Sequence, residues 1–176
     1  MIIGVVIDMQ NDFVTGTLGT PEAQAVVPYI QNEVRDPKYD IVLFTQDWHN
    51  RVPERNTIEM KNIPYHCLAG TKGAEIIKGL IPEGICSWNV YKKYTFAFYS
   101  LADVIVDEAC GFGDDVTEIH LMGVCTDICV ISNALLVRSA FPSVPIYVHE
   151  KGCAGTSPEA HEAALMIMRH CLIDVI

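Results

Sequence analysis

Short runs of Val, Ile and Leu recur along the chain and end abruptly in polar residues. They span 2–7, 41–45, 119–123, 144–148 and 172–176, with a weaker candidate at 86–91. Apolar runs of this length are typical of strands that are buried on both faces, as in parallel sheets. The sequence therefore predicts a mostly parallel sheet of about six strands.

Segments with helix signals separate these runs. Thr20 and Pro21 open a helix predicted to reach about residue 35, and Ser157 and Pro158 open another predicted to reach about residue 170. Further helices are predicted over 71–80, 100–110 and 126–141. Alternating strands and helices joined by right-handed crossovers give a parallel sheet with helices on both faces. We therefore expect an α/β protein with a three-layer α/β/α, Rossmann-like architecture, in a single domain over residues 1–176.

The net charge limits the classes of binding partner that are expected, and the cysteine content indicates the cellular compartment. The formal net charge of −10, with no run of Lys or Arg, opposes binding to nucleic acid or to an anionic membrane surface. Asp8 ends the first apolar run too early for a membrane span, so we interpret that run as a strand. Seven cysteines without framework spacing suit a reducing compartment, which predicts a cytoplasmic protein. The five cysteines other than Cys125 and Cys129 are assigned to the core.

Polar clusters follow three of the predicted strands, where open parallel sheets bind their ligands. The clusters are Asp8-Met9-Gln10-Asn11-Asp12-Phe13, Gln46-Asp47-Trp48-His49 and Val124-Cys125-Thr126-Asp127-Ile128-Cys129. Because the carboxyl ends of parallel strands meet at one edge, we expect these clusters to converge there.

The third cluster predicts a nucleophile. Thr126 or Asp127 can cap a helix, which would place the Cys129 thiol near free backbone N–H groups and lower its pKa. The same N–H groups could bind the oxyanion that forms when a thiolate attacks a carbonyl. The alternative interpretation is that Cys125 and Cys129 are small core residues.

A proton acceptor and a cation are available nearby. Asp8 ends an apolar strand, where a desolvated carboxylate would have a raised pKa and could accept a thiol proton; alternatively it caps the next turn. Lys92 or Lys93, beside the aromatic run 94–98, could stabilise the thiolate, although lysines are more often at the surface.

Four further side chains could hold a metal ion. Asp47 and His49 are two positions apart on an extended segment, so they point to the same side. Glu59 and His66 lie in an irregular loop over 49–70, a length that is usually functional. Two imidazoles and two carboxylates suit zinc, iron or manganese, whereas the alternative is that these are solvated loop residues.

Taken together, three segments resemble the isochorismatase-like cysteine hydrolases, and the likeness covers nearly the whole chain. They are 6–13 (VIDMQNDF), 45–49 (TQDWH) and 123–130 (GVCTDICV). The nicotinamidase-type branch is the most similar, because its loop runs from Asp-x-His through a Glu to Pro-x-His-Cys and Gly-Thr. These elements match Asp47-Trp48-His49, Glu59, Pro64-Tyr65-His66-Cys67 and Gly70-Thr71.

The resemblance implies roles for these residues. Asp8, Lys93 and Cys129 would form a catalytic triad, and one divalent ion, zinc foremost, would be held by Asp47, His49, Glu59 and His66. A cis peptide bond before Cys125 would turn its N–H, with that of Cys129, into an oxyanion hole. Small amides such as nicotinamide would then be hydrolysed through a Cys thioester with release of ammonia.

The sequence departs from the pattern of this branch in two places, which affect the expected substrate and the choice of the catalytic lysine. Nicotinamidases sandwich the substrate ring between aromatics, one matching Phe13 and the other matching Ile63 here, so Trp48 or Tyr65 would have to substitute. The usual Lys-Pro-Thr-Phe-Gly-Ser reads 93-KYTFAF-98 here, which keeps Lys92 as an alternative to Lys93.

Other functions stay open at this point. A cysteine hydrolase of N-carbamoyl or aliphatic amides would tolerate the missing aromatic, and a catalytically inactive, metal-stabilised binding protein is the alternative outside enzymes. Isochorismate hydrolysis is disfavoured because it would leave Cys129 without a purpose. The family also implies a homo-oligomer, a dimer or a tetramer.

Overall fold

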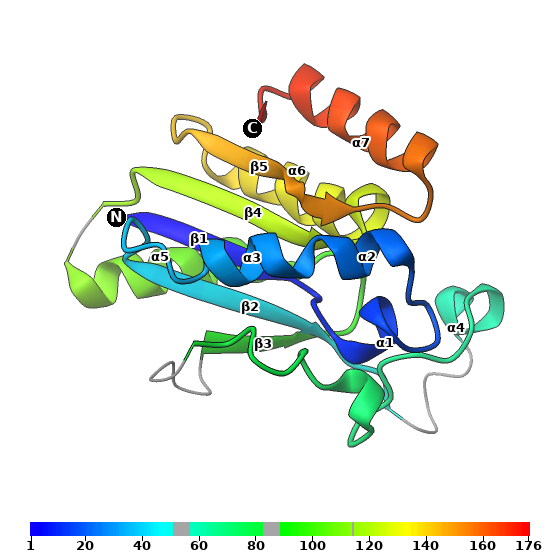
Figure 1. Cartoon of the computed structure of the whole chain (residues 1–176). Helices are drawn as coiled ribbons and strands as arrows, with labels where there is room; N and C mark the ends of the chain where they lie inside the picture. The colour runs from blue at the N-terminus through cyan, green and yellow to red at the C-terminus, as the bar shows by residue number, and fades with distance from the viewer. Residues whose placement is uncertain (51–56, 83–88, 114) are drawn as a thin grey trace.

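The computed structural model describes residues 1–50, 57–82, 89–113 and 115–176. Within them the strands form one parallel sheet in the order β3-β2-β1-β4-β5-β6, which confirms the predicted α/β class (Figure 1). The strands are β1 Ile2–Ile7, β2 Ile41–Asp47, β3 Val90–Lys93, β4 Glu118–Val124, β5 Ile146–Ala154 and β6 Asp174–Val175. No helix in these ranges is both long and apolar enough to span a bilayer.

Helices cover both faces of the sheet. The larger ones are α2 Pro21–Ala25, α3 Val27–Glu33, α5 Leu101–Phe112, α6 Ile131–Ala140 and α7 Pro158–His170. Alternate residues of β1 point to opposite faces, so Val5 packs with α5, α6 and α7, whereas Val6 packs with α2 and α3. Two apolar cores therefore lie on either side of the sheet, and the three-layer prediction is confirmed.

Three predicted elements differ from the structure. The helix over 20–35 is divided into α2 and α3, where Pro28 lies in the first turn of the second helix. The helix predicted over 71–80 is wrong: only a 3-10 turn, Lys72–Ala74, forms there. Gly79 has φ +81, and Ile76 instead makes an antiparallel bridge to Gln10.

The predicted strand boundaries also shift. The fifth strand begins at Ile146 and continues to Ala154. Its pairing with β4 shifts register between Leu121 and Gly123, so the polar residues in the middle of β5 are passed over and pairing resumes at Cys153. The weak strand candidate over 86–91 falls partly on residues 83–88, which lie outside the described residues. Within the described residues, β3 spans Val90–Lys93 and so ends two residues later than predicted. Of the five cysteines assigned to the core, Cys67 and Cys153 are buried and Cys171 is half-buried, whereas Cys110 is exposed, so the assignment is wrong for Cys110. Cys86 lies outside the described residues.

Short elements extend from the carboxyl ends of the strands. α1 (Asn11–Val14) follows β1, α4 (Ile58–Asn62) follows β2, and a π-helical turn (Thr126–Val130) follows β4 and leads into α6. The chain turns to opposite sides of the sheet after β1 and after β4, which makes their carboxyl ends the topological switch point. Ligand-binding crevices form at such points.

Candidate active site and metal centre

Asp8, Lys93 and Cys129 meet in one buried cluster at the switch point. Asp8 directly follows β1, Lys93 ends β3 and Cys129 lies in the turn after β4. The Nζ atom of Lys93 is 2.7 Å from Oδ2 of Asp8 and 3.6 Å from Sγ of Cys129. Lys92 lies elsewhere, with its Nζ 3.7 Å from the centroid of the Trp48 ring. The geometry therefore selects Lys93 over Lys92.

Burial governs the protonation of this cluster. It raises the pKa of Asp8, although Lys93 opposes the shift. It also opposes the charge on Lys93, but the anionic neighbours, Asp8 and Asp47 among them, outweigh it and hold the Lys93 pKa well above its usual range. The pKa of Cys129 is raised by burial and by the same carboxylates, so the predicted lowering is wrong. The cysteine rests as a thiol beside a charged lysine.

The turn that carries Cys129 differs from a capped helix start. Its N-cap is Cys125 and no side chain caps it. Thr126 Oγ1 instead contacts His161 Nδ1 at 2.8 Å, and the Asp127 carboxylate accepts bonds from the N–H and hydroxyl of Thr156 at 2.8 and 2.5 Å. The prediction that Thr126 or Asp127 caps the turn is therefore wrong. The peptide bond between Val124 and Cys125 is cis.

A second cluster contains Asp47, His49, Glu59 and His66, whose ligand atoms all lie within 4.8 Å of one another. Oδ2 of Asp47 is 2.7 Å from Nε2 of His49 and 3.3 Å from Nε2 of His66, and Oε1 of Glu59 is 3.8 and 3.5 Å from the same two nitrogens. A tetrahedral zinc ion with bonds of about 2.0–2.1 Å would separate its ligands by roughly 3.3 Å. The donor set and its spacing therefore fit a divalent metal ion.

The neighbourhood of this cluster orients its ligands. Nδ1 of His66 contacts the carbonyl oxygen of Pro64 at 2.7 Å, which leaves Nε2 to face the carboxylates. The loop behind His66 is held because the N–H of Cys67 donates to Oδ2 of Asp12 at 2.8 Å. Such contacts fix a ring orientation before any ligand binds.

Asp47 links the two clusters. Its Oδ2 faces the two histidines, whereas its Oδ1 is 3.2 Å from Nζ of Lys93. Burial raises the pKa of Asp47, but hydrogen bonds from His49 and His66 outweigh burial and hold that pKa well below its usual range. Asp47 is therefore an anion that joins the candidate metal ligands to the Asp8, Lys93 and Cys129 cluster.

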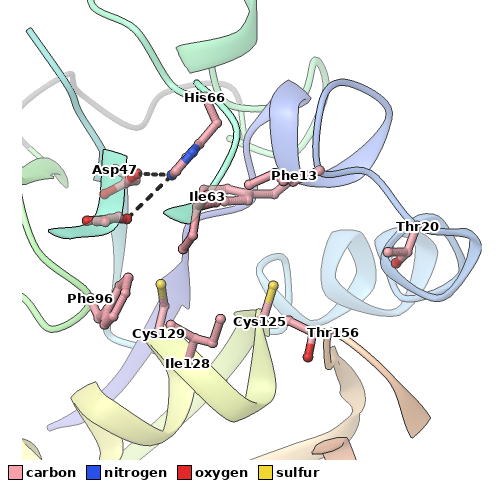
Figure 2. Close-up of a pocket in the computed structure, with 12 residues that line it drawn as sticks. Phe13, Thr20, Asp47, Ile63, His66, Phe96, Cys125, Ile128, Cys129 and Thr156 are labelled. Carbon is pink, nitrogen blue, oxygen red and sulfur yellow. Dashed lines mark ion pairs between the residues drawn. The ribbon is translucent and has the colours of Figure 1, made fainter. Parts of the chain in front are cut away.

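Both clusters open into one cavity of about 340 Å³. In Figure 2 the thiols of Cys125 and Cys129 point into the space between Phe13, Ile63 and Phe96, with Asp47 and His66 at one end. Among the described residues the cavity is lined by Phe13, Leu18, Thr20, Asp47, Glu59, Ile63, His66, Phe96, Cys125, Ile128, Cys129 and Thr156. The wall is mostly apolar, and its polar groups lie at the metal-ligand end and near the thiols.

The expected aromatic substitutes do not line this cavity. Trp48 packs under Lys92, and Tyr65 is 49% exposed; neither is among the lining residues. Phe13 does line it, as predicted from the sequence, and Phe96 supplies a second ring. Sequence reasoning noted the aromatic run that contains Phe96 but used it only to locate the lysine.

Sequence reasoning also missed three buried polar residues that hold the site. The hydroxyl of Thr45 donates to Oδ1 of Asp8 at 2.7 Å. Nδ2 of Asn133 donates to the carbonyl oxygen of Cys129 at 2.8 Å, and its Oδ1 accepts from the N–H of Phe98 at 2.8 Å. Gln10 bonds to the backbone of Asp47. The available signal was a polar residue inside an otherwise apolar strand or helix.

Comparison with known proteins agrees with this geometry. The isochorismatase domain model matches residues 3–176. A nicotinamidase of Schizosaccharomyces pombe is 26% identical over 98% of this chain and 91% of its own length. An isochorismatase family protein of Bacillus subtilis is 29% identical over 92% of this chain and 90% of its own length.

Solved structures show the same fold. The pyrazinamidase of Pyrococcus horikoshii in complex with zinc has a TM-score of 0.81 at 25% identity, over 99% of this chain and 98% of its own. A nicotinamidase of Bacillus subtilis has a TM-score of 0.77 at 27% identity, over the same shares of the two chains. With the matched motifs and the buried cysteine cluster, these findings show that the chain belongs to the isochorismatase family, on its nicotinamidase branch.

Proposed function

We propose that the protein is a metal-containing cysteine amidohydrolase that cleaves the carboxamide of nicotinamide or a related small heteroaromatic amide and releases ammonia. One observation carries this proposal: Cys129, which contacts Lys93 of the buried cluster, lines the same cavity as three of the four candidate metal ligands, Asp47, Glu59 and His66. A nucleophile and a candidate positioning group are thereby combined around one cavity that can hold a small ring. The nicotinamidase and pyrazinamidase relatives support the same reaction class.

The chemistry begins with a proton transfer from Cys129 to Asp8. Oδ1 of Asp8 is held by Thr45, whereas Oδ2 pairs with Lys93 and receives no aligned hydrogen bond within the described residues, so it can take the thiol proton. Lys93, with its raised pKa, stays charged and stabilises the thiolate as it forms. Because the resting cysteine is a thiol, this transfer accompanies attack on the amide carbon.

The remaining steps use the same groups. The backbone N–H groups of Cys125 and Cys129 are proposed to bind the oxyanion of the tetrahedral intermediate. As it collapses, the carbon–nitrogen bond breaks, Asp8 returns the proton to the leaving nitrogen, and ammonia departs from a Cys129 thioester. Water, deprotonated by Asp8, then attacks the thioester carbon and releases the acid and the free thiol.

The metal is assigned to Asp47, His49, Glu59 and His66. When bound there, a divalent ion, zinc in our proposal, would supply a Lewis-acidic position for a ring nitrogen of the substrate. The protein's own contribution at that end is a pair of buried imidazoles held by carboxylates.

The cavity wall favours a neutral substrate. In the described part of the chain no Lys or Arg lines it, so a carboxylate-bearing N-carbamoyl acid would enter without a cationic partner. Phe13 and Phe96 supply ring faces for a heteroaromatic amide, while Ile63 leaves one wall aliphatic. A neutral aliphatic amide is therefore the second candidate.

The cytoplasmic location, the homo-oligomer and the single domain over 1–176 stay predictions.

The test is ammonia release from nicotinamide by the purified protein and by Cys129→Ala. Cys153→Ala serves as the matched control, because Cys153 is also a buried thiol but does not line the cavity. We expect release by wild type and by the control, and none by Cys129→Ala.

Two other outcomes would change the assignment. If wild type binds metal and Cys129 is alkylated by iodoacetamide but no ammonia forms, nicotinamide is the wrong substrate, and aliphatic and N-carbamoyl amides are assayed next. An unreactive Cys129 together with no hydrolysis of any amide would instead identify a binding protein.

A further inference from the structure

The side chain of Gln10 occupies the place of a missing strand neighbour beside Asp47. β1 pairs with β2 only as far as Val6 and Phe44, after which the chain turns away at Asp8, where φ is +50. On its other side β2 still pairs with β3 through Asp47 and Lys93. The edge of Asp47 that faces β1 therefore has no strand to bond with.

The Gln10 amide fills this gap with three hydrogen bonds. Its Oε1 accepts from the N–H of Asp47 at 2.8 Å, and its Nε2 donates to the carbonyl oxygen of Asp47 at 2.8 Å. Nε2 also donates to the carbonyl oxygen of Ala74 at 2.8 Å. The side chain is fully buried, so water cannot replace any of these bonds if one is lost. Gln10 thus holds both backbone groups of Asp47 at once.

We propose that Gln10 is a positioning residue that fixes Asp47, and through Asp47 aligns the metal ligands with Lys93. Rotation of the Asp47 backbone would displace both of its carboxylate oxygens, one facing His49 and His66 and the other facing Lys93. Partners behind a metal ligand of this kind typically change metal affinity by about 10- to 100-fold when removed. The inference rests on the proposed metal site.

Gln46 provides a matched control. It is the neighbour of Asp47 on β2, and its Nε2 donates to the same Ala74 carbonyl oxygen at 2.6 Å. Within the described residues, its side chain makes no hydrogen bond to the backbone of Asp47. Gln10→Met and Gln46→Met each replace an amide by an apolar chain of similar length. Both lose the Ala74 contact, and only Gln10→Met releases Asp47.

The experiment titrates metal-free wild type and both variants with zinc by calorimetry, and with cobalt by visible absorption. We expect Gln10→Met to bind zinc about 10- to 100-fold more weakly, whereas Gln46→Met stays within about 3-fold of wild type. At saturating cobalt, the absorption bands of Gln10→Met should also shift, which a loss of stability alone would not cause.

The outcomes separate the two proposals. If wild type binds neither metal, the proposed metal site fails, whatever the variants do. If wild type binds and Gln10→Met matches it in affinity and spectrum, the positioning role is overturned. Gln10→Asn, which keeps the amide but is one methylene too short to reach Asp47, repeats the test should the Met variant not fold. If neither folds while Gln46→Met does, Gln10 is a folding determinant and the proposal is likewise overturned.

Discussion

Replacing Lys93 with Met removes the only charge that separates two buried carboxylates in the described site, at nearly constant side-chain length. Nζ of Lys93 lies 2.7 Å from Asp8 and 3.2 Å from Asp47. With an effective dielectric constant of about 20, these distances correspond to roughly 6 and 5 kcal/mol of attraction. Desolvation of the lysine offsets much of that attraction, and breaking a buried pair typically costs about 3–5 kcal/mol. We therefore expect the free energy of unfolding of metal-free Lys93→Met to be about 3–5 kcal/mol lower than that of wild type at pH 8. The variant should also lose amide hydrolysis.

The pH dependence of the lost stability tests whether the unpaired Asp8 carboxylate causes it. Burial raises the folded-state pKa of Asp8, and Lys93 opposes that shift, so the variant raises the Asp8 pKa further. A group with a raised folded-state pKa binds its proton more tightly when folded, and stability is lost as pH rises through that pKa. The deficit of Lys93→Met should therefore be smaller at pH 5 than at pH 8, as measured by urea unfolding of both proteins.

The neighbouring lysine is the control. Lys92 is exposed and lies over the Trp48 ring, an arrangement worth about 0.5–1 kcal/mol. Lys92→Met should keep its hydrolytic activity and lose no more stability than that. If Lys93→Met unfolds at the same urea concentration as Lys92→Met at pH 8, the buried charge does not hold the cluster and the reasoning is refuted.

Three further perturbations test other parts of the structure. Asn133→Leu leaves the carbonyl of Cys129 without its side-chain donor and should destabilise the protein by about 1–3 kcal/mol in urea unfolding, with a lower kcat for ammonia release. Ile63→Trp adds a ring to the cavity wall and should lower the KM for nicotinamide about 2- to 10-fold at unchanged kcat, measured by steady-state kinetics. Burial lowers the pKa of His149 to about 4, so the unfolded chain binds the extra proton between about pH 6.5 and 4, and stability falls as pH drops through that window. The shift corresponds to at most about 3 kcal/mol, and urea unfolding of His149→Gln at pH 7 and pH 5 should show a shallower fall than wild type.

Each of these has a contrary result. An Asn133→Leu protein with wild-type stability and kcat would show that the turn holds Cys129 unaided. A raised KM in Ile63→Trp would show that the substrate needs the aliphatic wall, which favours an aliphatic amide. Equal pH slopes for wild type and His149→Gln would place the acid sensitivity in the carboxylates.

The sequence predicted which residues come together at the candidate site, because strand ends concentrate them. Asp8, Asp47 and Cys125 follow apolar runs that are recognisable one at a time, and parallel topology then brings their ends together. The fold class followed from the same runs. Neither inference needs to know how side chains pack, and this is why both could be drawn from one sequence.

The predictions that proved wrong are those that depend on tertiary packing. The pKa of Cys129 was predicted from its own turn, but burial, together with Asp8 and Asp47 at the ends of two other strands, reverses the direction of the shift. Trp48 and Tyr65 were chosen by residue type, whereas the loop geometry directs Phe96 into the cavity instead. The predicted helix over 71–80 does not form because Glu75 and Ile77 bond to Asn11 and Met9, and the backbone bonds within the segment span only three residues.

The order of the strands explains why Asp47, one of the candidate metal ligands, contacts the proposed triad of Asp8, Lys93 and Cys129. β2 lies between β1, which carries Asp8, and β3, which carries Lys93, so a side chain at the end of β2 has a neighbour from the triad on each side. Its loop continues directly into the histidine ligands. A carboxylate at Asp47 can therefore present Oδ1 to Lys93 and Oδ2 to the metal position. Changes to the two clusters should consequently be non-additive, because each acts through the same anion.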